Sequence, residues 1–395
     1  MGNMSIFSFQ GELSASKSLL NRALVAKSYQ PDLKIIGDSE CDDVQLMRVG
    51  LADLIAGRKV ECGHAGTVLR FLALRASRIP GVHILTGSER LFSRPQTELL
   101  PILGQLGAEA KLERNILRIN SQGWRLIVDG LQINAQRSSQ FASAVILNAW
   151  KLKFPLHFHM SRKMVSQGYL RMSLELVRKL GMHIEDNGSE FFIPANQQIM
   201  LRKYVIEPDL SSAFAVAAMA VVAGSARIHN FLPHSLQPDF LFIRILQDMG
   251  ADIKISDNEL QVMKTEKLNG ININLEKCPD LLPILGVLCA LAKTPSLIEG
   301  VGHAQFKESA RVDKTKELLQ IMGATVESQE NSLYIKPGNS RLNAVNTVFF
   351  DVDQDHRMVM AATVAKWAGY LIQVGDVKAV SKSFPEFLKI TGDMQ

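Results

Sequence analysis

The sequence lacks the features that mark several large classes of protein. Its four cysteines form no CxxC pair and have no histidine at metal-ligand spacing: Cys41, Cys62, Cys278 and Cys289. This spacing argues against a zinc site and against a disulfide framework, so we expect no metal. The longest apolar runs, residues 213–224 and 281–292, are too short to cross a bilayer and predict buried helices instead. The first residues also lack the charged-then-apolar order of a signal peptide, and we expect a cytoplasmic protein.

The basic residues are not gathered into a stripe. The formal net charge is +5, but lysine and arginine are scattered along all 395 residues. A nucleic-acid surface or a membrane is therefore not expected as a partner, and small anionic substrates are favoured. A composition of 47% hydrophobic and 21% charged residues is typical of a globular protein with room for two domains.

What the sequence does contain is a repeat. Four times an apolar helical pattern ends at a glycine and is followed by a strand, a polar turn and a second strand, at residues 102–119, 176–193, 245–262 and 318–335. The glycines are suited to left-handed helix caps, and they are Gly107, Gly181, Gly250 and Gly323. Their spacings of 74, 69 and 73 residues indicate a duplicated unit.

A second series supports the same period. The segment 138–142, SSQFA, recurs 73 residues later as SSAFA, and both read as helix starts. With further helix starts at Lys17, Thr67 and His356, the chain predicts about six α/β units, of which the first is shortened. Strand-like residues give way to a new helix start near 206–208. We therefore expect one domain of residues 14–207, and a discontinuous one of residues 1–13 and 208–395.

Residues 14–24, SASKSLLNRAL, form a helix start rich in polar groups. Ser14 or Ser16 can cap the helix, while Ser18 and Arg22 are four residues apart and share a face. Together with the Lys17 ammonium they can converge on a phosphate or a carboxylate. The alternative is an ordinary capped helix with solvated charges.

Similar polar clusters recur along the chain. A glycine turn at residues 62–67 opens a helix, residues 90–95 place two arginines in an expected loop, and Ser138-Ser139-Gln140 starts another helix. Each of these also has a simple structural interpretation as a cap, a turn or a solvated face. Asp280 can be an N-cap or a general base.

The ordered set of motifs is more specific than any member of it. From Lys17 to Pro385 the chain contains SKSxxNRAL, GxAGT, RP, SSQF, VSxxY, PD, KESxR, DHRM and SKSFP in that order. This set resembles the 5-enolpyruvylshikimate-3-phosphate synthase family. The resemblance implies an inverse α/β barrel of two domains, each built of three βαβαββ units, with the active site in the interdomain cleft. It also implies transfer of the enolpyruvyl group of phosphoenolpyruvate to the 5-hydroxyl of shikimate 3-phosphate, without metal or cofactor, by a monomer.

The resemblance also implies a role for each matching residue. The catalytic group is Lys17, Asp280, Glu308 and Lys382, with Asp280 taking the proton of the 5-hydroxyl and Glu308 protonating the methylene carbon. The phosphoenolpyruvate group is Lys17, Gly66, Arg94, Gln140, Arg311, Arg357 and Lys382. The shikimate 3-phosphate group is Lys17, Ser18, Arg22, Ser138, Ser139, Gln140, Ser166, Tyr169, Asp280 and Lys307.

Some positions depart from the family pattern. His64, Phe71, His303 and Ala310 stand where Asn, Pro, Asn and Asp are usual, and Gln167-Gly168 replaces a typical Lys-Pro. Two alternatives therefore stay open: an enolpyruvyl transferase acting on another acceptor, such as a shikimate-like compound or UDP-N-acetylglucosamine, and a non-catalytic anion-binding relative. We also expect His64 and Phe71 to weaken the family's inhibitor glyphosate.

Overall fold

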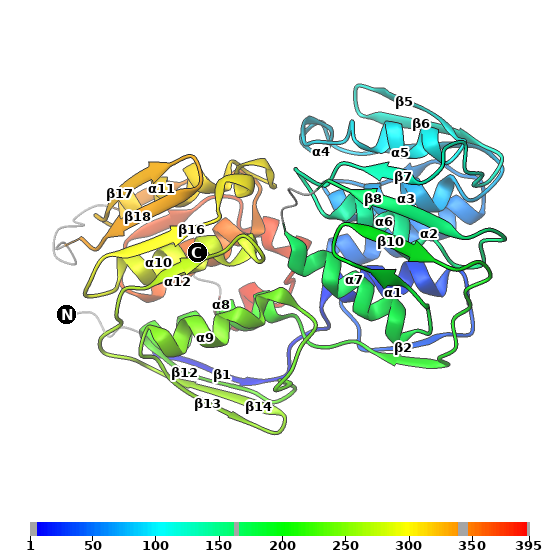
Figure 1. The fold of residues 1–395 in the computed structure, drawn as a ribbon. Coiled ribbons are helices and arrows are strands. Elements are labelled where there is room, and N and C mark those ends of the chain that lie inside the picture. Colours follow the sequence, from blue (N-terminus) through cyan, green and yellow to red (C-terminus); the bar gives the residue numbers. More distant parts are fainter. Residues whose placement is uncertain (1–5, 162–165, 339–346, 393–395) are drawn as a thin grey trace. The chain divides into compact units, whose positions relative to one another are not determined.

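The computed structural model describes residues 6–161, 166–338 and 347–392 and divides the chain into two compact units. We call residues 15–206 the inserted unit, and residues 1–14 with 207–395 the discontinuous unit. Figure 1 shows both units along the chain. Val165, the first residue of the VSxxY motif, lies outside the described residues.

The inserted unit alternates short strands with helices (Figure 1). Its strands are β2 (Lys34–Ile36), β3 (Val60–Glu61), β4 (Gly81–Thr86), β5 (Glu109–Glu113), β6 (Ile116–Ser121), β7 (Leu131–Ile133), β8 (Leu156–Met160), β9 (Glu185–Asp186), β10 (Glu190–Ile193) and β11 (Lys203–Val205). Its helices are α1 (Lys17–Lys27), α2 (Asp42–Ile55), α3 (Gly66–Ala76), α4 (Glu89–Ser93), α5 (Leu99–Gln105), α6 (Gln140–Leu147) and α7 (Gln167–Lys179).

The discontinuous unit repeats that alternation. Its strands are β1 (Phe7–Gly11), β12 (Gly224–Ile228), β13 (Asp252–Ser256), β14 (Glu259–Met263), β15 (Asn272–Asn274), β16 (Ser296–Glu299), β17 (Thr325–Gln329), β18 (Ser332–Lys336), β19 (Val348–Phe350) and β20 (Ile372–Val374). Its α-helices are α8 (Leu210–Ala223), α9 (Leu241–Asp248), α10 (Leu282–Ala290), α11 (Arg311–Ile321), α12 (His356–Trp367) and α13 (Phe387–Ile390). Its 3₁₀ turns are η1 (Pro238–Phe240), η2 (Pro279–Leu281), η3 (Gly302–Phe306) and η4 (Val377–Lys382).

The strands of the described residues form six small sheets, three in each unit. Four of these sheets share one plan, in which a parallel pair is followed by an antiparallel hairpin: β3-β4-β6-β5, β7-β8-β10-β9, β1-β12-β14-β13 and β15-β16-β18-β17. The other two, β2 with β11 and β19 with β20, contain the parallel pair alone. The prediction of six repeated α/β units with a shortened first unit is confirmed, and the structure adds a second short sheet.

The repeated glycines lie where the sequence predicts them. Gly107, Gly181, Gly250 and Gly323 each follow a helix and have φ values of 80°, 108°, 81° and 80°. Each glycine is followed by a β-hairpin. Glycine adopts this left-handed conformation without the steric penalty of a Cβ atom. The same residue therefore ends the helix and turns the chain into the hairpin that follows.

One local prediction is wrong. Residues 90–95 were expected to form a loop, but Glu89–Ser93 form the helix α4. Ser88 accepts a hydrogen bond from the amide of Leu91 at 3.1 Å, and Pro95 follows two residues after the helix ends. A serine N-cap and a downstream proline delimit a short helix, which places Arg94 at its C-terminal cap.

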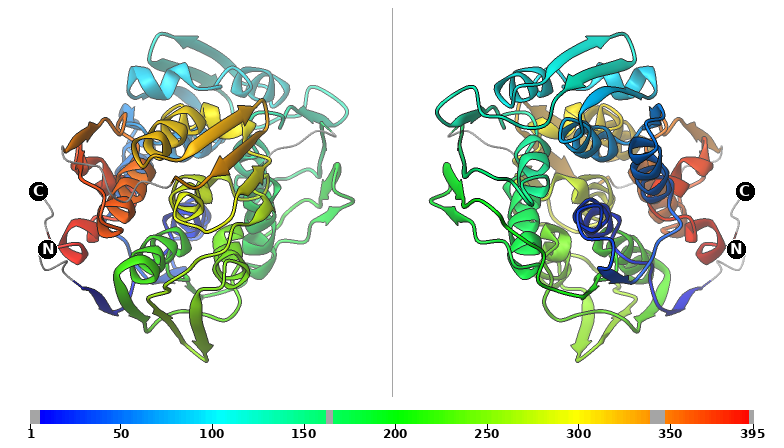
Figure 2. Two further views of the ribbon diagram at one scale, coloured as in Figure 1. Left: turned by 90° about the vertical axis from the view of Figure 1, so that its left-hand side faces the viewer. Right: turned by 90° about the vertical axis from the view of Figure 1, so that its right-hand side faces the viewer.

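The core of the discontinuous unit consists of apolar helices. Nearly every residue of α8 and α10 is buried, and α12 packs against both helices. Figure 2 shows these helices inside their unit, with small sheets outside them. The two longest apolar runs of the sequence therefore become core helices, as predicted. In the described part of the chain no helix combines the length and apolar character that a membrane span requires.

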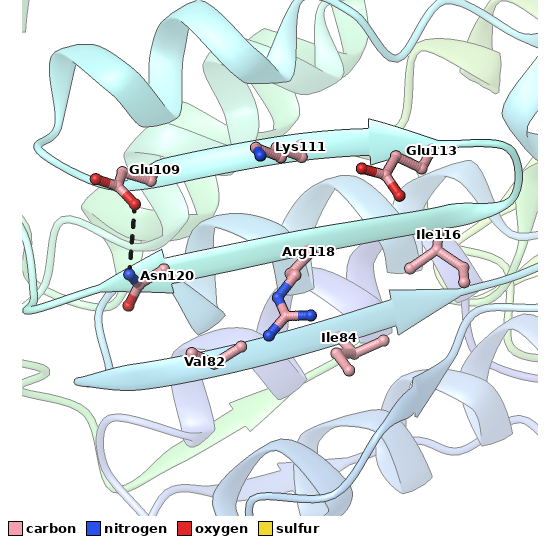
Figure 3. A pocket seen from close by; sticks show the side chains of 8 residues that line it. All are labelled: Val82, Ile84, Glu109, Lys111, Glu113, Ile116, Arg118 and Asn120. Carbon is pink, nitrogen blue, oxygen red and sulfur yellow. Dashed lines mark hydrogen bonds between the residues drawn. The ribbon is translucent and has the colours of Figure 1, made fainter.

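A cavity of about 470 Å³ lies on the solvent face of the β3-β4-β6-β5 sheet. Lys111 and Arg118 lie there between Glu109 and Glu113 (Figure 3). Glu109 at one end accepts a hydrogen bond from Asn120 at 3.4 Å. None of the residues lining this cavity is a predicted site residue. The predicted site residues lie instead at the polar N-terminal ends of helices in both units.

Candidate active site

In the inserted unit Arg70 ties together the starts of several elements. Its guanidinium donates to Ser138 Oγ at 3.1 Å, to Gln140 Oε1 at 2.8 Å and to the carbonyl oxygen of Pro95 at 2.8 Å. Gln140 in turn donates to Thr67 Oγ1 at 3.2 Å. The glycine turn, the RP loop and the SSQ helix start are therefore joined through one buried arginine, to which the sequence analysis gave no role.

Arg22 is buried among neutral groups. It donates to Ser173 Oγ at 2.7 Å and to the carbonyl oxygens of Ser18 and Tyr169 at 2.7 and 3.3 Å. Its guanidinium lies 5.2 Å from the ring centroid of Phe71. Burial lowers the pKa of Arg22 to about 9, and no carboxylate contacts it among the described residues. A buried cation with only dipolar partners is stabilised when an anion binds beside it.

Two further predicted residues of this unit have protein partners. The Lys17 ammonium lies 3.0 Å from a carboxylate oxygen of Asp43, which compensates a cation placed at the positive end of a helix. The guanidinium of Arg94 lies against Gly66, where a Cβ atom would stand 3.2 Å from Nη1. Glycine at the first position of α3 thus leaves room for the arginine, and the structure brings these two predicted residues together.

The predicted hydroxyl groups lie at helix starts. Ser138 Oγ accepts from the amide of Gln140 at 3.2 Å, and Ser139 is the N-cap residue of α6. Ser166 precedes α7 with a left-handed φ of 56°, and its carbonyl accepts from the amide of Tyr169. These residues are therefore positioned by caps and turns, and their binding role stays a prediction.

In the discontinuous unit Arg311 is surrounded by carboxylates. It has no exposed side-chain surface and donates to Asp280 at 2.7 Å, to Glu308 at 2.7 Å and to Asp355 at 2.9 Å. These three carboxylates raise the pKa of Arg311 against the lowering effect of burial. The guanidinium therefore connects the two residues that the resemblance assigns to proton transfer.

Asp280 lies at the centre of the cationic groups. Arg357 donates to its second oxygen at 2.9 Å, and the Lys307 ammonium lies 3.5 Å from its first. Burial favours the neutral acid, but Arg357, Lys307 and Arg311 outweigh it and hold the pKa of Asp280 well below its usual value. Asp280 is therefore a carboxylate at neutral pH, held in η2 just before α10.

Asp355 positions several candidate site residues, and the sequence reasoning gave it no role. Its side chain is fully buried, caps α12 by accepting from the Arg357 amide at 2.9 Å, and accepts from Ser309 at 2.9 Å. One carboxylate thus fixes both the KESxR segment and the DHRM helix start. The DHRM motif contained the signal, because an aspartate directly before a helix predicts a cap.

Lys382 completes the predicted set in this unit, and His303, a departure from the family pattern, lies in the electrostatic environment of Lys307 and Asp280. Burial and the neighbouring Lys307 lower the pKa of His303 to about 4, against the opposing effect of Asp280, so its imidazole is neutral. Lys382 is buried at the end of η4, which packs against α12. Each unit therefore contains a cluster of cations and helix starts, and the discontinuous unit adds Asp280 and Glu308, the two carboxylates to which the resemblance assigns proton transfer.

The sequence matches the model of a known protein family. The model described as EPSP synthase (3-phosphoshikimate 1-carboxyvinyltransferase) matches residues 13–390. A 3-phosphoshikimate 1-carboxyvinyltransferase of Methanoculleus marisnigri is 32% identical and covers 83% of this chain and 77% of its own. The enzyme of that name from Methanoregula boonei is 30% identical over 95% of this chain and 94% of its own.

Solved structures share the fold. An EPSP synthase from Acinetobacter baumannii matches with a TM-score of 0.76 and 18% identity, covering 98% of this chain and 95% of that one. The enolpyruvyl transferase NikO from Streptomyces tendae matches with a TM-score of 0.71 and 15% identity, covering 100% and 95%. Because the family model and these relatives span nearly the whole sequence, the chain belongs to the EPSP synthase family of 3-phosphoshikimate 1-carboxyvinyltransferases.

Proposed function

We propose that this chain transfers the enolpyruvyl group of phosphoenolpyruvate to the 5-hydroxyl of shikimate 3-phosphate, and that the clusters of both units act on this one pair of substrates. The observation that carries the proposal is the set of three cations around the ionised carboxylate of Asp280. Two polyanionic substrates repel each other strongly unless fixed positive charges and helix starts compensate them.

The inserted unit supplies the site for shikimate 3-phosphate. Arg22, Ser18 and Tyr169 bind one end of the substrate, and the hydroxyls of Ser138, Ser139 and Ser166 receive its phosphate. The polar partners of Arg22 are all neutral among the described residues, so an anionic substrate adds the first charge that compensates it. Gln140, which accepts a hydrogen bond from Arg70, contacts both substrates in this proposal.

Phosphoenolpyruvate is bound by cations from both units. Lys17, Gly66 and Arg94 belong to the inserted unit, while Arg311, Arg357 and Lys382 belong to the discontinuous unit. When its anionic groups approach Arg357 and Arg311, they compete with Asp280 for the same guanidinium donors. The pKa of Asp280 then rises toward its ordinary value, so substrate binding itself makes this carboxylate a better base.

The chemical steps then follow from the two carboxyl groups. Asp280 takes the proton of the 5-hydroxyl of shikimate 3-phosphate while the hydroxyl oxygen forms a bond to C2 of phosphoenolpyruvate. Glu308 in its acid form delivers a proton to the methylene carbon. The product of this addition is a tetrahedral intermediate. Loss of a methyl proton back to Glu308 and cleavage of the bond between C2 and the phosphate oxygen then release phosphate, and Asp280 returns its proton to the departing phosphate oxygen. Lys17 and Lys382 stabilise the charge that develops.

The acceptor specificity tests this proposal. Purified wild-type protein, which we expect to be a cytoplasmic monomer, is given phosphoenolpyruvate with shikimate 3-phosphate, with shikimate or with UDP-N-acetylglucosamine, and phosphate release is measured. We expect release with shikimate 3-phosphate only. Release with another acceptor alone identifies an enolpyruvyl transferase of different specificity, and binding of both substrates without release identifies a non-catalytic relative.

A further inference from the structure

A second cavity, of about 830 Å³, lies in the discontinuous unit. The last turns of α12, the strand β20, the start of η4 and the helix α13 line it. None of its described lining residues is a predicted site residue, so the proposed reaction does not account for it. Its volume is within the range of small-molecule sites, which is about 300–1,000 Å³.

The position of this cavity follows from the repeated plan of the sheets. In the four larger sheets the second strand of the parallel pair also pairs with an antiparallel hairpin, as β12 does with β14 and β16 with β18. The strand β20 follows α12 in the same way that β12 follows α8 and β16 follows α10. Among the described residues, however, β20 pairs with β19 alone. The edge of β20 that would meet a hairpin is therefore open.

The lining shows that the cavity lies along this open edge. Residues 369–374 line it without a gap, and they include all three residues of β20. Successive side chains of a strand point to opposite faces of the sheet, so a cavity over one face takes every second residue, as in Figure 3. No described residue of β19 lines the cavity. It therefore lies beside β20, on the side away from β19.

Much of the lining is apolar. Tyr370, Val374 and Leu388 are partly buried and pack against the core of the unit, and each also faces the cavity. Leu371, which lines the cavity as well, is 47% exposed. An apolar group that enters the cavity covers this surface and gains the free energy of its burial.

The charge of the lining has one sign. Lys366 from α12 and Lys378 from η4 line the cavity, and its described lining residues include no aspartate or glutamate. The hydroxyls of Thr363 and Thr391 donate to helix carbonyl oxygens at 2.9 and 3.1 Å, so the positive groups of the lining are the two lysines. Burial lowers the pKa of Lys366, and an anion beside an ammonium group favours its charged form.

We propose that this cavity is a second ligand site, which binds a small organic anion with an aromatic or branched apolar body. The anionic group contacts the ammonium groups of Lys366 and Lys378. The apolar body lies against Val374 and Leu388, beside the open edge of β20. Apolar surface with a few charged groups is the composition typical of small-molecule sites, and here the charge selects anions.

Phenylacetate is the probe, and calorimetric titration of the full-length protein without substrates measures its binding at pH 7. Phenylacetamide keeps the ring and has no charge, while acetate keeps the charge and has no ring. We expect each of these two to bind at least roughly tenfold more weakly than phenylacetate, since each loses one of the two interactions. Equal affinities for phenylacetate and phenylacetamide overturn the inference.

Lysine variants locate the bound anion. Lys366→Met and Lys378→Met keep the apolar stem of the side chain, and each is expected to weaken phenylacetate binding by roughly tenfold. Neither should change the affinity for phenylacetamide. Lys254→Met is the matched control, because Lys254 is an exposed lysine of β13 in the same unit and does not line the cavity. An equal loss in Lys254→Met contradicts a specific site.

An obstructing variant tests the cavity itself. Gln373 is an exposed residue of β20 that lines the cavity, so Gln373→Trp places an indole there without disturbing the core. We expect this variant to lose phenylacetate binding while its thermal unfolding midpoint stays close to that of the wild type. Unchanged phenylacetate affinity in Gln373→Trp and Lys366→Met means that the probe binds elsewhere, such as at the cations around Asp280, and overturns the inference.

Discussion

The carboxylate of Asp280 and the guanidinium of Arg311 lie 2.7 Å apart, and the Arg311 side chain has no exposed surface. The same guanidinium also contacts Glu308 and Asp355. Removing one partner from such a buried network leaves charges without compensation, and this costs more than the pair itself contributes. The stability of the discontinuous unit and the proposed proton transfer therefore involve the same side chains.

Arg311→Met is expected to destabilise the protein strongly. The substitution keeps most of the side-chain volume but leaves three carboxylates facing one another, and we expect a loss of about 3–5 kcal/mol in the free energy of unfolding at pH 7. Urea unfolding measures it. The control is Arg244→Met, since Arg244 is 75% exposed in its pair with Asp248 and its loss is expected to stay within about 0.5 kcal/mol. Equal losses in the two variants contradict the prediction.

The contribution of Asp280 to stability depends on pH. Because its folded pKa is lowered, the stabilisation is fully present above the unfolded pKa of about 3.9 and is lost as the pH falls through the folded value. The difference in free energy of unfolding between the wild type and Asp280→Asn is therefore constant from pH 7 to pH 5 and shrinks below pH 4. Chemical denaturation at pH 7, 5 and 3 measures it, and a difference that grows toward pH 3 disproves this assignment.

Arg22→Met is expected to separate binding from stability. The arginine is buried with neutral partners, and its lowered pKa of about 9 shows that the folded protein disfavours its charge. An apolar side chain beside Phe71 should leave the free energy of unfolding unchanged or slightly higher, while the Kd for shikimate 3-phosphate rises by roughly 100-fold. Calorimetric titration and thermal unfolding give the two values. Arg118→Met, on the sheet face of Figure 3, is the matched control and should bind normally.

His64 is expected to reduce inhibition by glyphosate. Its Nδ1 lies 2.9 Å from Ser88 Oγ, and this contact ties the glycine turn to the cap of α4, the helix that precedes Arg94. His64→Asn should lower the glyphosate concentration that halves phosphate release. Phe71→Pro is added in a second step, because a proline inside α3 removes a helical hydrogen bond and costs about 3 kcal/mol. Unchanged inhibition in the double variant rejects this role.

The sequence predicted what depends on local patterns. The four repeated glycines and their hairpins follow from backbone conformation and strand alternation within about 20 residues, and the structure has them where expected. The short helix α4 was missed because its serine cap was not weighed against the two arginines that follow.

Side-chain pairing between distant segments could not be predicted in the same way. Nothing in the spacing shows that Asp43 neutralises Lys17, that Arg70 holds Ser138 and Gln140, or that Arg311 contacts three carboxylates. Such pairs depend on which helix N-termini lie close together in the folded protein. The motifs predicted candidate residues, and the structure adds the charged and polar partners that surround them.

The most direct test of the central claim compares phosphate release by the wild type, Asp280→Asn and Glu308→Gln, with phosphoenolpyruvate and shikimate 3-phosphate both present. These substitutions keep the shape of the side chain and remove its negative charge together with its ability to exchange a proton. The account predicts release by the wild type that requires both substrates, and a loss of at least about 100-fold in kcat for each variant, with shikimate 3-phosphate still bound. Wild-type rates in both variants would contradict it, because proton transfer would then belong to other groups.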